Sequence, residues 1–146
     1  MKRILLTLLA VATLSITATS CSKEGLVESA AHLVDVRYDD WHKEASLNYV
    51  YCPINLSSIS GNVLTEGTVS VYVYEGNRQC PLPYVYPILV TYDDGTTDYV
   101  GENLRYDVER GRVTLIMQDL DGIQPQIDRN TCPDMTFRIV VSAPVE

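Results

Sequence analysis

The carboxylates of this chain form two clusters whose spacing could begin a calcium loop. Asp93 and Asp94 stand close to Asp98, and Asp119 is separated from Asp121 by one residue. Calcium requires six to eight oxygen ligands, and neither cluster completes the twelve-residue pattern of an EF-hand, because its closing Glu is missing. We therefore expect solvated turn residues at both places and no metal site.

The motifs of nucleophilic and metal-assisted catalysis are missing from the sequence. There is no Gly-x-Ser-x-Gly, no His-Glu-x-x-His and no glycine-rich phosphate loop. His32 and His42 are the two histidines, and we expect both to be polar surface residues. Two carboxylates of a glycoside hydrolase could still converge from distant strands, since sequence spacing does not fix their separation. We predict that the protein is not an enzyme and uses no cofactor, with a small hydrolase as the alternative.

Tyrosine is the residue type that most suggests binding. The chain contains 10 Tyr, against one Phe and one Trp. Tyr72 and Tyr74 alternate with Val71 and Val73, so these rings face outward if the valines face the core. With Trp41 they could form a surface that stacks on sugar rings or contacts a partner protein. The alternative is that Tyr simply covers a half-exposed sheet.

A period of two in hydrophobicity predicts strands with one buried face. The alternation of apolar and polar residues is clearest in residues 69–74, 112–118 and 136–142. Further candidate strands are residues 33–38, 46–54, 84–92 and 97–100. The total is about seven strands.

Turn and capping residues separate these strands. The pair Asp94-Gly95 is a strong hairpin signal, because Gly adopts a positive φ without strain. Ser60 and Gly67 are suited to cap the two ends of one short helical turn. Short strands at intervals of roughly ten residues, joined by turns that contain Gly or Pro, favour an antiparallel arrangement over a parallel α/β sheet.

The predicted architecture is all-β. Residues 32–146 are expected to form a single antiparallel Ig-like β-sandwich of about seven strands with one short helical turn. A small closed barrel is the alternative, since the number of strands does not distinguish the two folds. A domain of this size buries enough surface to fold without a metal or a disulfide framework.

The first residues have the pattern of a secretion signal. Lys2 and Arg3 precede residues 4–19, an uncharged apolar stretch that is shorter than the roughly 20 residues of a transmembrane helix. Removal of residues 1–20 would take both basic residues away and change the formal net charge from -8 to -10. A chain with this much negative charge repels the phosphate backbones of nucleic acids, so we expect no nucleic-acid partner.

The end of this stretch, Ala18-Thr19-Ser20-Cys21, resembles the lipobox of bacterial lipoproteins. In that family the Cys receives a diacylglycerol and becomes the new N-terminus. The resemblance implies a lipoprotein signal peptide at residues 1–20 and attachment to the membrane through lipid on Cys21. Lipoboxes usually carry Leu where this chain has Ala18, so cleavage by an ordinary signal peptidase is the alternative.

The segment after Cys21 also bears a resemblance. Residues 22–24, Ser-Lys-Glu, are similar to the short charged export tag of Bacteroidota surface lipoproteins. Residues 21–31 are expected to form the lipidated N-terminus and a flexible tether. The resemblance implies a cell-envelope location, as an outer-membrane lipoprotein exposed at the surface.

A pattern of structural residues runs through most of residues 47–142. It comprises Ile59, Val63, Leu64, Gly67, Val69, Val71 and Tyr72, then Pro81-Leu82-Pro83-Tyr84, and finally Phe137-Arg138-Ile139-Val140-Val141. This pattern resembles that of a family of small Bacteroidota outer-membrane lipoproteins with β-rich domains. The resemblance implies fold and location, and it carries no catalytic residue over to this chain.

The remaining cysteines raise the question of a disulfide. With Cys21 assigned to lipid by the lipobox resemblance, Cys52, Cys80 and Cys132 remain in a compartment where disulfides can form. Three pairs are open, and Cys80 with Cys132 is favoured because both lie outside the predicted strands. A zinc site is the alternative, although no Cys-x-x-Cys pair is present.

These observations together predict a non-enzymatic, lipid-anchored protein of the cell envelope. Its expected role is that of a surface binding or accessory module for a glycan or a partner protein. A purely structural envelope lipoprotein is the alternative.

The lipid anchor can be tested at Cys21. The substitution Cys21→Ala removes the sulfur that would carry the lipid, so it is expected to abolish fatty-acid labelling and to release the protein into the soluble fraction. Metabolic labelling with an alkyne-tagged fatty acid, followed by fractionation, measures both effects. Cys52→Ala is the matched control and should keep both label and membrane association. Unchanged membrane association of the Cys21 variant would refute the anchor.

Overall fold

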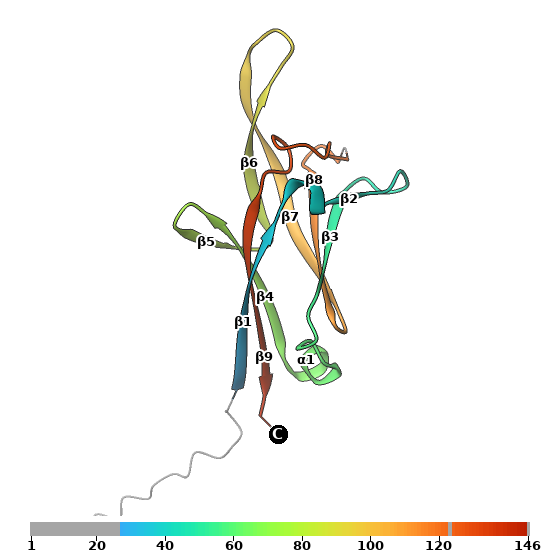
Figure 1. The fold of residues 1–146 in the computed structure, drawn as a ribbon, viewed down its shortest axis with the longest axis vertical. Coiled ribbons are helices and arrows are strands. Elements are labelled where there is room, and N and C mark those ends of the chain that lie inside the picture. Colours follow the sequence, from blue (N-terminus) through green and yellow to red (C-terminus); the bar gives the residue numbers. More distant parts are fainter. Residues whose placement is uncertain (1–26, 123, 146) are drawn as a thin grey trace, which may run out of the picture.

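Two antiparallel β-sheets pack against each other in this chain (Figure 1). A computed structural model describes residues 27–122 and 124–145. The predicted signal peptide, the lipidation of Cys21 and the first part of the predicted tether lie outside the described residues. Within the described part of the chain, no helix is long and apolar enough to cross a membrane.

The described residues contain nine strands and two short helices. The strands are β1 (Val27–Val36), β2 (His42–Lys43), β3 (Val50–Asn55), β4 (Thr68–Glu75), β5 (Arg78–Pro81), β6 (Tyr84–Thr91), β7 (Thr97–Glu109), β8 (Arg112–Asp119) and β9 (Met135–Pro144). The helices are the 3-10 turn η1 (Tyr38–Asp40) and α1 (Gly61–Glu66). One sheet has the order β1-β9-β4-β5, and the other has the order β2-β3-β8-β7-β6.

The predicted all-β sandwich is confirmed, since the strands form two separate sheets rather than one closed barrel. Two strands were not expected. β2 and β5 are short and each pairs with one neighbour, so their few residues show no alternation to detect. β7 also continues to Glu109, well beyond the predicted end at Val100.

The domain begins earlier than predicted. β1 starts at Val27 and pairs with β9 along its whole length, so residues 27–31 are strand, and the expected tether boundary before His32 is wrong. The side chains of these five residues are all exposed. They therefore carry no hydrophobic pattern, and their strand conformation comes from hydrogen bonding to β9.

Inward-facing side chains of both sheets form one core. Its fully or almost fully buried members include Val50, Val71, Val73, Leu104, Val113, Leu115, Met117, Phe137, Ile139 and Val141. Along β4, β8 and β9 these residues occur at every second position, as the sequence predicted. Each such side chain contributes roughly 1.5–3 kcal/mol through burial, so the core fixes which residues of each strand face outward.

The short helix α1 forms where the cap residues predicted it. The Ser60 hydroxyl accepts a hydrogen bond from the backbone N–H of Val63 at 3.3 Å, and Gly67 follows the last helical residue. The backbone at Gly67 passes very close to Ser142 of β9 and to Val63. A Cβ at this position would meet the Ser142 carbonyl oxygen and would lie 2.8 Å from the Val63 carbonyl oxygen. Close backbone packing is therefore what requires Gly67, since its φ of -100° is one that any residue adopts.

The two ends of the sandwich differ. Val27 at the start of β1 pairs with Pro144 at the end of β9, so the described chain begins and ends on the same side. The β6–β7 hairpin projects from the opposite end (Figure 1). An N-terminal anchor would therefore leave this hairpin at the far end of the domain.

The packing at Gly67 predicts a difference between two glycines. Gly67→Ala should lower the free energy of unfolding by about 2–4 kcal/mol, because backbone atoms must move to make room for the methyl group. Gly61→Ala is the control, since nothing lies within 4 Å of a Cβ there. It should be neutral or stabilise α1 by up to about 1 kcal/mol. Urea denaturation followed by circular dichroism measures both, and equal stability of the two variants would contradict the close approach.

Candidate functional site

A hollow of about 500 Å³ lies on the outer face of the five-stranded sheet. Its lining residues are Glu44, Leu47, Tyr49, Tyr51, Asp107, Val108, Glu109, Thr114 and Ile116, and we call it the Tyr49 hollow. Its volume falls in the range of about 300–1,000 Å³ that is typical of ligand pockets. Thr114 and Ile116 alternate with the core residues of β8, which places the hollow outside the sandwich core.

The loop between β2 and β3 builds one wall of the hollow. Ile116 points away from the core and yet is only 1% exposed, because the loop that carries Leu47 and Tyr49 lies against this face of the sheet. The side-chain amide of Gln124 donates to the carbonyl oxygens of Glu44 at 2.7 Å and Tyr49 at 3.1 Å. Gln124 thus holds the two ends of the loop in place.

The two tyrosines of the hollow are each oriented by a neighbour. The Arg105 guanidinium lies 5.3 Å from the centroid of the Tyr49 ring, a cation–π distance. The Tyr51 ring is tilted against His42 at a centroid distance of 5.5 Å. The Tyr51 hydroxyl donates to Glu44 Oε1 at 2.6 Å, and this hydrogen bond is the main reason that the pKa of Tyr51 is raised. Both rings are therefore positioned before any ligand arrives.

The carboxylates of the hollow are also paired. Asp107 lies 3.7 Å from the Arg105 guanidinium, and Glu109 lies 3.0 Å from that of Arg112. Glu44 accepts from Tyr51. The arrangement offers charged acceptors and guanidinium donors beside aromatic rings, which suits hydrogen bonding to hydroxyl groups. Each of the three carboxylates is already paired with an arginine or a tyrosine, so the hollow does not offer a free acid and a free base for catalysis.

The predicted binding surface of Trp41, Tyr72 and Tyr74 is not assembled. Trp41 is 3% exposed and belongs to the core, so its inclusion in an exposed surface is wrong. The chain turns Trp41 inward just before β2. Tyr72 and Tyr74 do face outward, opposite the buried Val71 and Val73, as the alternation predicted.

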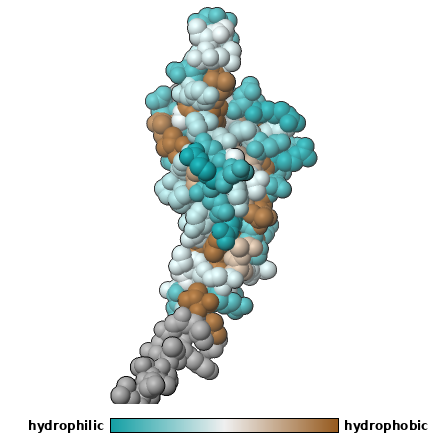
Figure 2. All heavy atoms as spheres, turned by 90° about the vertical axis from the view of Figure 1, so that its left-hand side faces the viewer, coloured by the Kyte–Doolittle hydropathy of each residue, from teal (hydrophilic) through white to brown (hydrophobic). Residues whose placement is uncertain are grey.

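The outer face that carries Tyr72 and Tyr74 belongs to the four-stranded sheet. Tyr74 Oη accepts from the Gln79 amide at 3.0 Å, and Gln79 Oε1 accepts from Arg138 at 3.1 Å. Tyr72 lies beside Arg138 and Pro81 in the strand register. Figure 2 shows the side on which β5 projects, and its surface is largely hydrophilic with apolar atoms in separate patches. The tyrosines here pack into a polar sheet surface.

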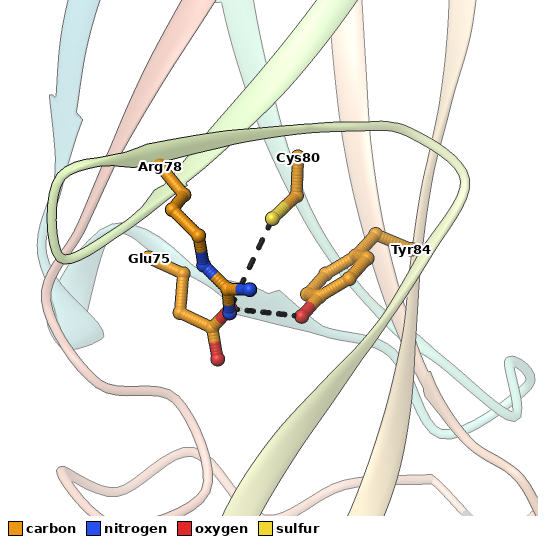
Figure 3. A network of polar contacts seen from close by, with 4 residues as sticks. All are labelled: Glu75, Arg78, Cys80 and Tyr84. Atoms are coloured by element: carbon orange, nitrogen blue, oxygen red, sulfur yellow. Dashed lines mark hydrogen bonds and ion pairs between the residues drawn. The ribbon is translucent and has the colours of Figure 1, made fainter.

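Cys80 lies in a polar network that spans the β4–β5 hairpin and β6 (Figure 3). Glu75 Oε2 is its centre: it forms an ion pair with Arg78, accepts from Tyr84 Oη at 3.0 Å and lies 3.9 Å from the Cys80 Sγ. The hydrogen bond to Glu75 is the main reason that the pKa of Tyr84 is raised to about 12. The network ties the hairpin to the neighbouring sheet.

The predicted Cys80–Cys132 disulfide is wrong. Cys52, Cys80 and Cys132 are all free thiols. Cys132 is buried against the core, 3.9 Å from Met117 Sδ, whereas Cys80 faces Glu75. Burial raises the pKa of Cys132 to about 12 and that of Cys52 to about 11. Both buried thiols are therefore protonated at neutral pH and serve as packing residues.

The acidic clusters of the sequence act as turn residues. In the β6–β7 hairpin, Asp94 Oδ1 accepts from the backbone and hydroxyl of Thr96, which lowers the pKa of Asp94. Asp119 Oδ1 accepts from the backbone N–H of Asp121 at 2.6 Å. Across residues 27–122 and 124–145, no three His, Cys, Asp or Glu side chains are grouped in a way that could hold a metal ion.

One buried carboxyl was not anticipated. Glu102 is 2% exposed, faces inward from β7, and has no hydrogen-bond partner at Oε2. Desolvation raises its pKa to about 7, and the charge of Asp119 on the paired strand β8 adds to the shift. In the sequence, Leu104, Tyr106 and Val108 alternate with polar residues. This pattern could have extended the predicted strand beyond Val100, and it would have placed Glu102 on the inward face.

Comparison with known proteins identifies no family for this chain. No protein-family model matches the chain, and no curated protein matches it. Among solved structures, one match is the carboxy-terminal domain of the turkey type 3 siadenovirus fibre, avirulent form, complexed with 3-sialyllactose. The identity is 10%, the alignment covers 80% of this chain and 68% of that one, and the TM-score is 0.25. At this score the likeness carries no argument about fold or function.

Glu102 predicts an unusual dependence of stability on pH. The folded state binds its proton more tightly than the unfolded state does, so the stability that Glu102 contributes is present below about pH 4.5 and is lost as the pH rises through about 7. Glu102→Gln removes this titration. The unfolding free energy of the variant minus that of the wild type should therefore become more positive by on the order of 2 kcal/mol from pH 4 to pH 8, because only the wild type loses stability.

Denaturant unfolding at a series of pH values measures this difference. Asp119→Asn is the companion variant, and it should shift the transition to lower pH because a like charge is removed. A difference between Glu102→Gln and wild type that is independent of pH would contradict the prediction, because it would show that Glu102 has the same pKa in the folded and unfolded states.

Proposed function

We propose that this protein is a lipid-anchored binding module of the cell envelope, and that the Tyr49 hollow binds a saccharide. The anchor rests on the lipobox resemblance at Cys21. The binding role rests on one observation: the hollow brings two tyrosine rings together with three carboxylates on a rigid sheet face. The function requires no catalytic step.

The chemistry of the hollow matches that of a sugar ring. A pyranose presents an apolar face of C–H groups and a rim of hydroxyls. Tyr49 and Tyr51 supply amphipathic aromatic surface, and Leu47 supplies an apolar side chain above the buried Ile116. The carboxylate of Asp107 can accept from hydroxyl groups, and the guanidinium of Arg105 can donate to them.

The charges at the hollow favour neutral sugars over acidic ones. Glu44, Asp107 and Glu109 bring three negative charges to the lining, while Arg105 and Arg112 bring two positive charges beside it. The whole chain is acidic as well, with a formal net charge of -8. A carboxylated sugar would therefore be repelled, so the ligand proposed is a neutral glycan.

The hollow is also largely preformed. Gln124 holds the loop that carries Tyr49, Glu44 orients the Tyr51 ring through its hydroxyl, and Arg105 lies against Tyr49. Side chains that are ordered before binding lose little further entropy when a ligand arrives. This preorganisation favours a binding role for the Tyr49 hollow over a role for the flat face of Tyr72 and Tyr74.

The test is binding of the purified protein to an array of neutral and acidic glycans, followed by calorimetry with the ligands found. Tyr49→Ala should weaken binding by about tenfold or more through loss of the stacking surface. Tyr51→Phe keeps the ring and removes the hydroxyl, so it should cause a smaller loss. Tyr74→Ala, an equal truncation on the opposite sheet, is the matched control and should leave the affinity unchanged.

Two results would contradict the proposal. If the wild type binds no neutral glycan, the saccharide role is wrong. If Tyr74→Ala weakens binding as much as Tyr49→Ala does, the site lies on the four-stranded sheet instead of in the hollow.

A further inference from the structure

An exposed apolar patch covers one face of the β6–β7 hairpin. Four large apolar side chains there are strongly exposed: Val85 at 49%, Leu89 at 49%, Tyr99 at 69% and Leu120 at 61%. We call these four residues the hairpin patch. They face the same side of the five-stranded sheet as the Tyr49 hollow, which is lined by Asp107 and Glu109 at the other end of β7.

The hairpin patch draws its side chains from β6, from β7 and from the segment that follows β8. Leu89 of β6 is the register partner of Tyr99 of β7, and both alternate with inward-facing residues such as the buried Ile88. A Cβ built on Gly101 would lie 2.7 Å from Val85 Cγ1 and 2.8 Å from Leu120 Cδ1. Leu120, from the segment that follows β8, therefore lies over Gly101 next to Val85. The absence of a side chain at Gly101 is what lets Leu120 join the hairpin.

Negative charge surrounds the patch. Between Arg78 and Arg105 the sequence has no Lys, Arg or His. Asp93, Asp94 and Asp98 are exposed at the tip of the hairpin, and Asp121 is exposed directly after Leu120. Arg105, at the far end of β7, lies against Tyr49, and Arg129 lines a shallow hollow with Leu89 while its guanidinium lies 4.4 Å from the centroid of the Tyr38 ring. The four exposed carboxylates outnumber Arg129, so the rim of the patch is acidic in sum.

We propose that the hairpin patch is a docking surface for a protein segment that presents apolar side chains flanked by Lys or Arg. Exposed apolar patches with polar rims mark interaction sites, and rim charges select the partner through complementarity. A second copy of this chain would bring one acidic rim against another. An anionic lipid surface would be repelled in the same way. A basic protein partner is the occupant that the rim favours.

This docking surface does not depend on glycan binding in the Tyr49 hollow. It uses different residues, and its removal should leave glycan affinity unchanged. The hairpin also lies at the end of the domain opposite the start of β1 and the end of β9 (Figure 1).

The probe for this surface is a synthetic peptide of alternating Lys and Leu residues, compared with the same peptide carrying Glu in place of Lys. Fluorescence anisotropy at near-physiological salt should show binding of the Lys peptide about tenfold tighter than that of the Glu peptide. Leu89→Ser combined with Tyr99→Ser should weaken Lys-peptide binding by about tenfold with every charge retained. Leu33→Ser, at an exposed leucine on the opposite sheet, is the matched control and should have no effect.

The rim is tested with Asp93→Asn combined with Asp98→Asn, which should weaken binding of the Lys peptide. Glu28→Gln combined with Glu66→Gln removes the same amount of charge at exposed positions outside the hairpin and should not weaken it.

Equal binding of the Lys peptide to the wild type and to the Leu89/Tyr99 double variant would overturn the proposal, because the attraction would then be charge alone. Absence of Lys-peptide binding to the wild type would also overturn the proposal. A dimer in sedimentation velocity that disappears in the double variant would assign the patch to a second copy and would likewise overturn it.

Discussion

Burial of one face of each sheet determines which side chains this protein presents on its surface. Phe137 and Val73 from the four-stranded sheet pack in the same core as Leu115 and Leu104 from the five-stranded sheet. A shift of any strand by one residue would turn its buried residues to solvent and its polar residues into the core. The core therefore fixes the register, and the register decides which side chains are available on the two outer faces.

The two outer faces are different surfaces because the β2–β3 loop lies against the five-stranded sheet, whereas polar side chains link the strands on the other. On the five-stranded sheet, the β2–β3 loop covers Ile116 and is held by Gln124, which creates a hollow where the strands alone would form an open face. On the four-stranded sheet, Gln79 links Tyr74 to Arg138 within the sheet surface. The concavity proposed for binding is thus a product of loop packing more than of strand composition.

Much of the fold was predictable because it depends on local patterns. Alternation in β4, β8 and β9, the Asp94-Gly95 turn and the Ser60 cap all appear in the structure as expected. The failures occurred where tertiary contacts replace a local signal. Residues 27–31 are strand only because β9 pairs with them, and Trp41 is buried although its sequence neighbours are polar.

Local patterns of residues specify the class of the fold, the short helix and the outward orientation of Tyr72 and Tyr74, because periodicity and capping act over a few positions. Contacts between distant segments determine where the chain forms a hollow, which thiols remain free and which carboxyl is buried without a partner. Tyr49 and Asp107 are far apart in the sequence and meet because β3 and β7 both pair with β8. Contacts of this kind depend on the path of the whole chain, which no short stretch of residues encodes.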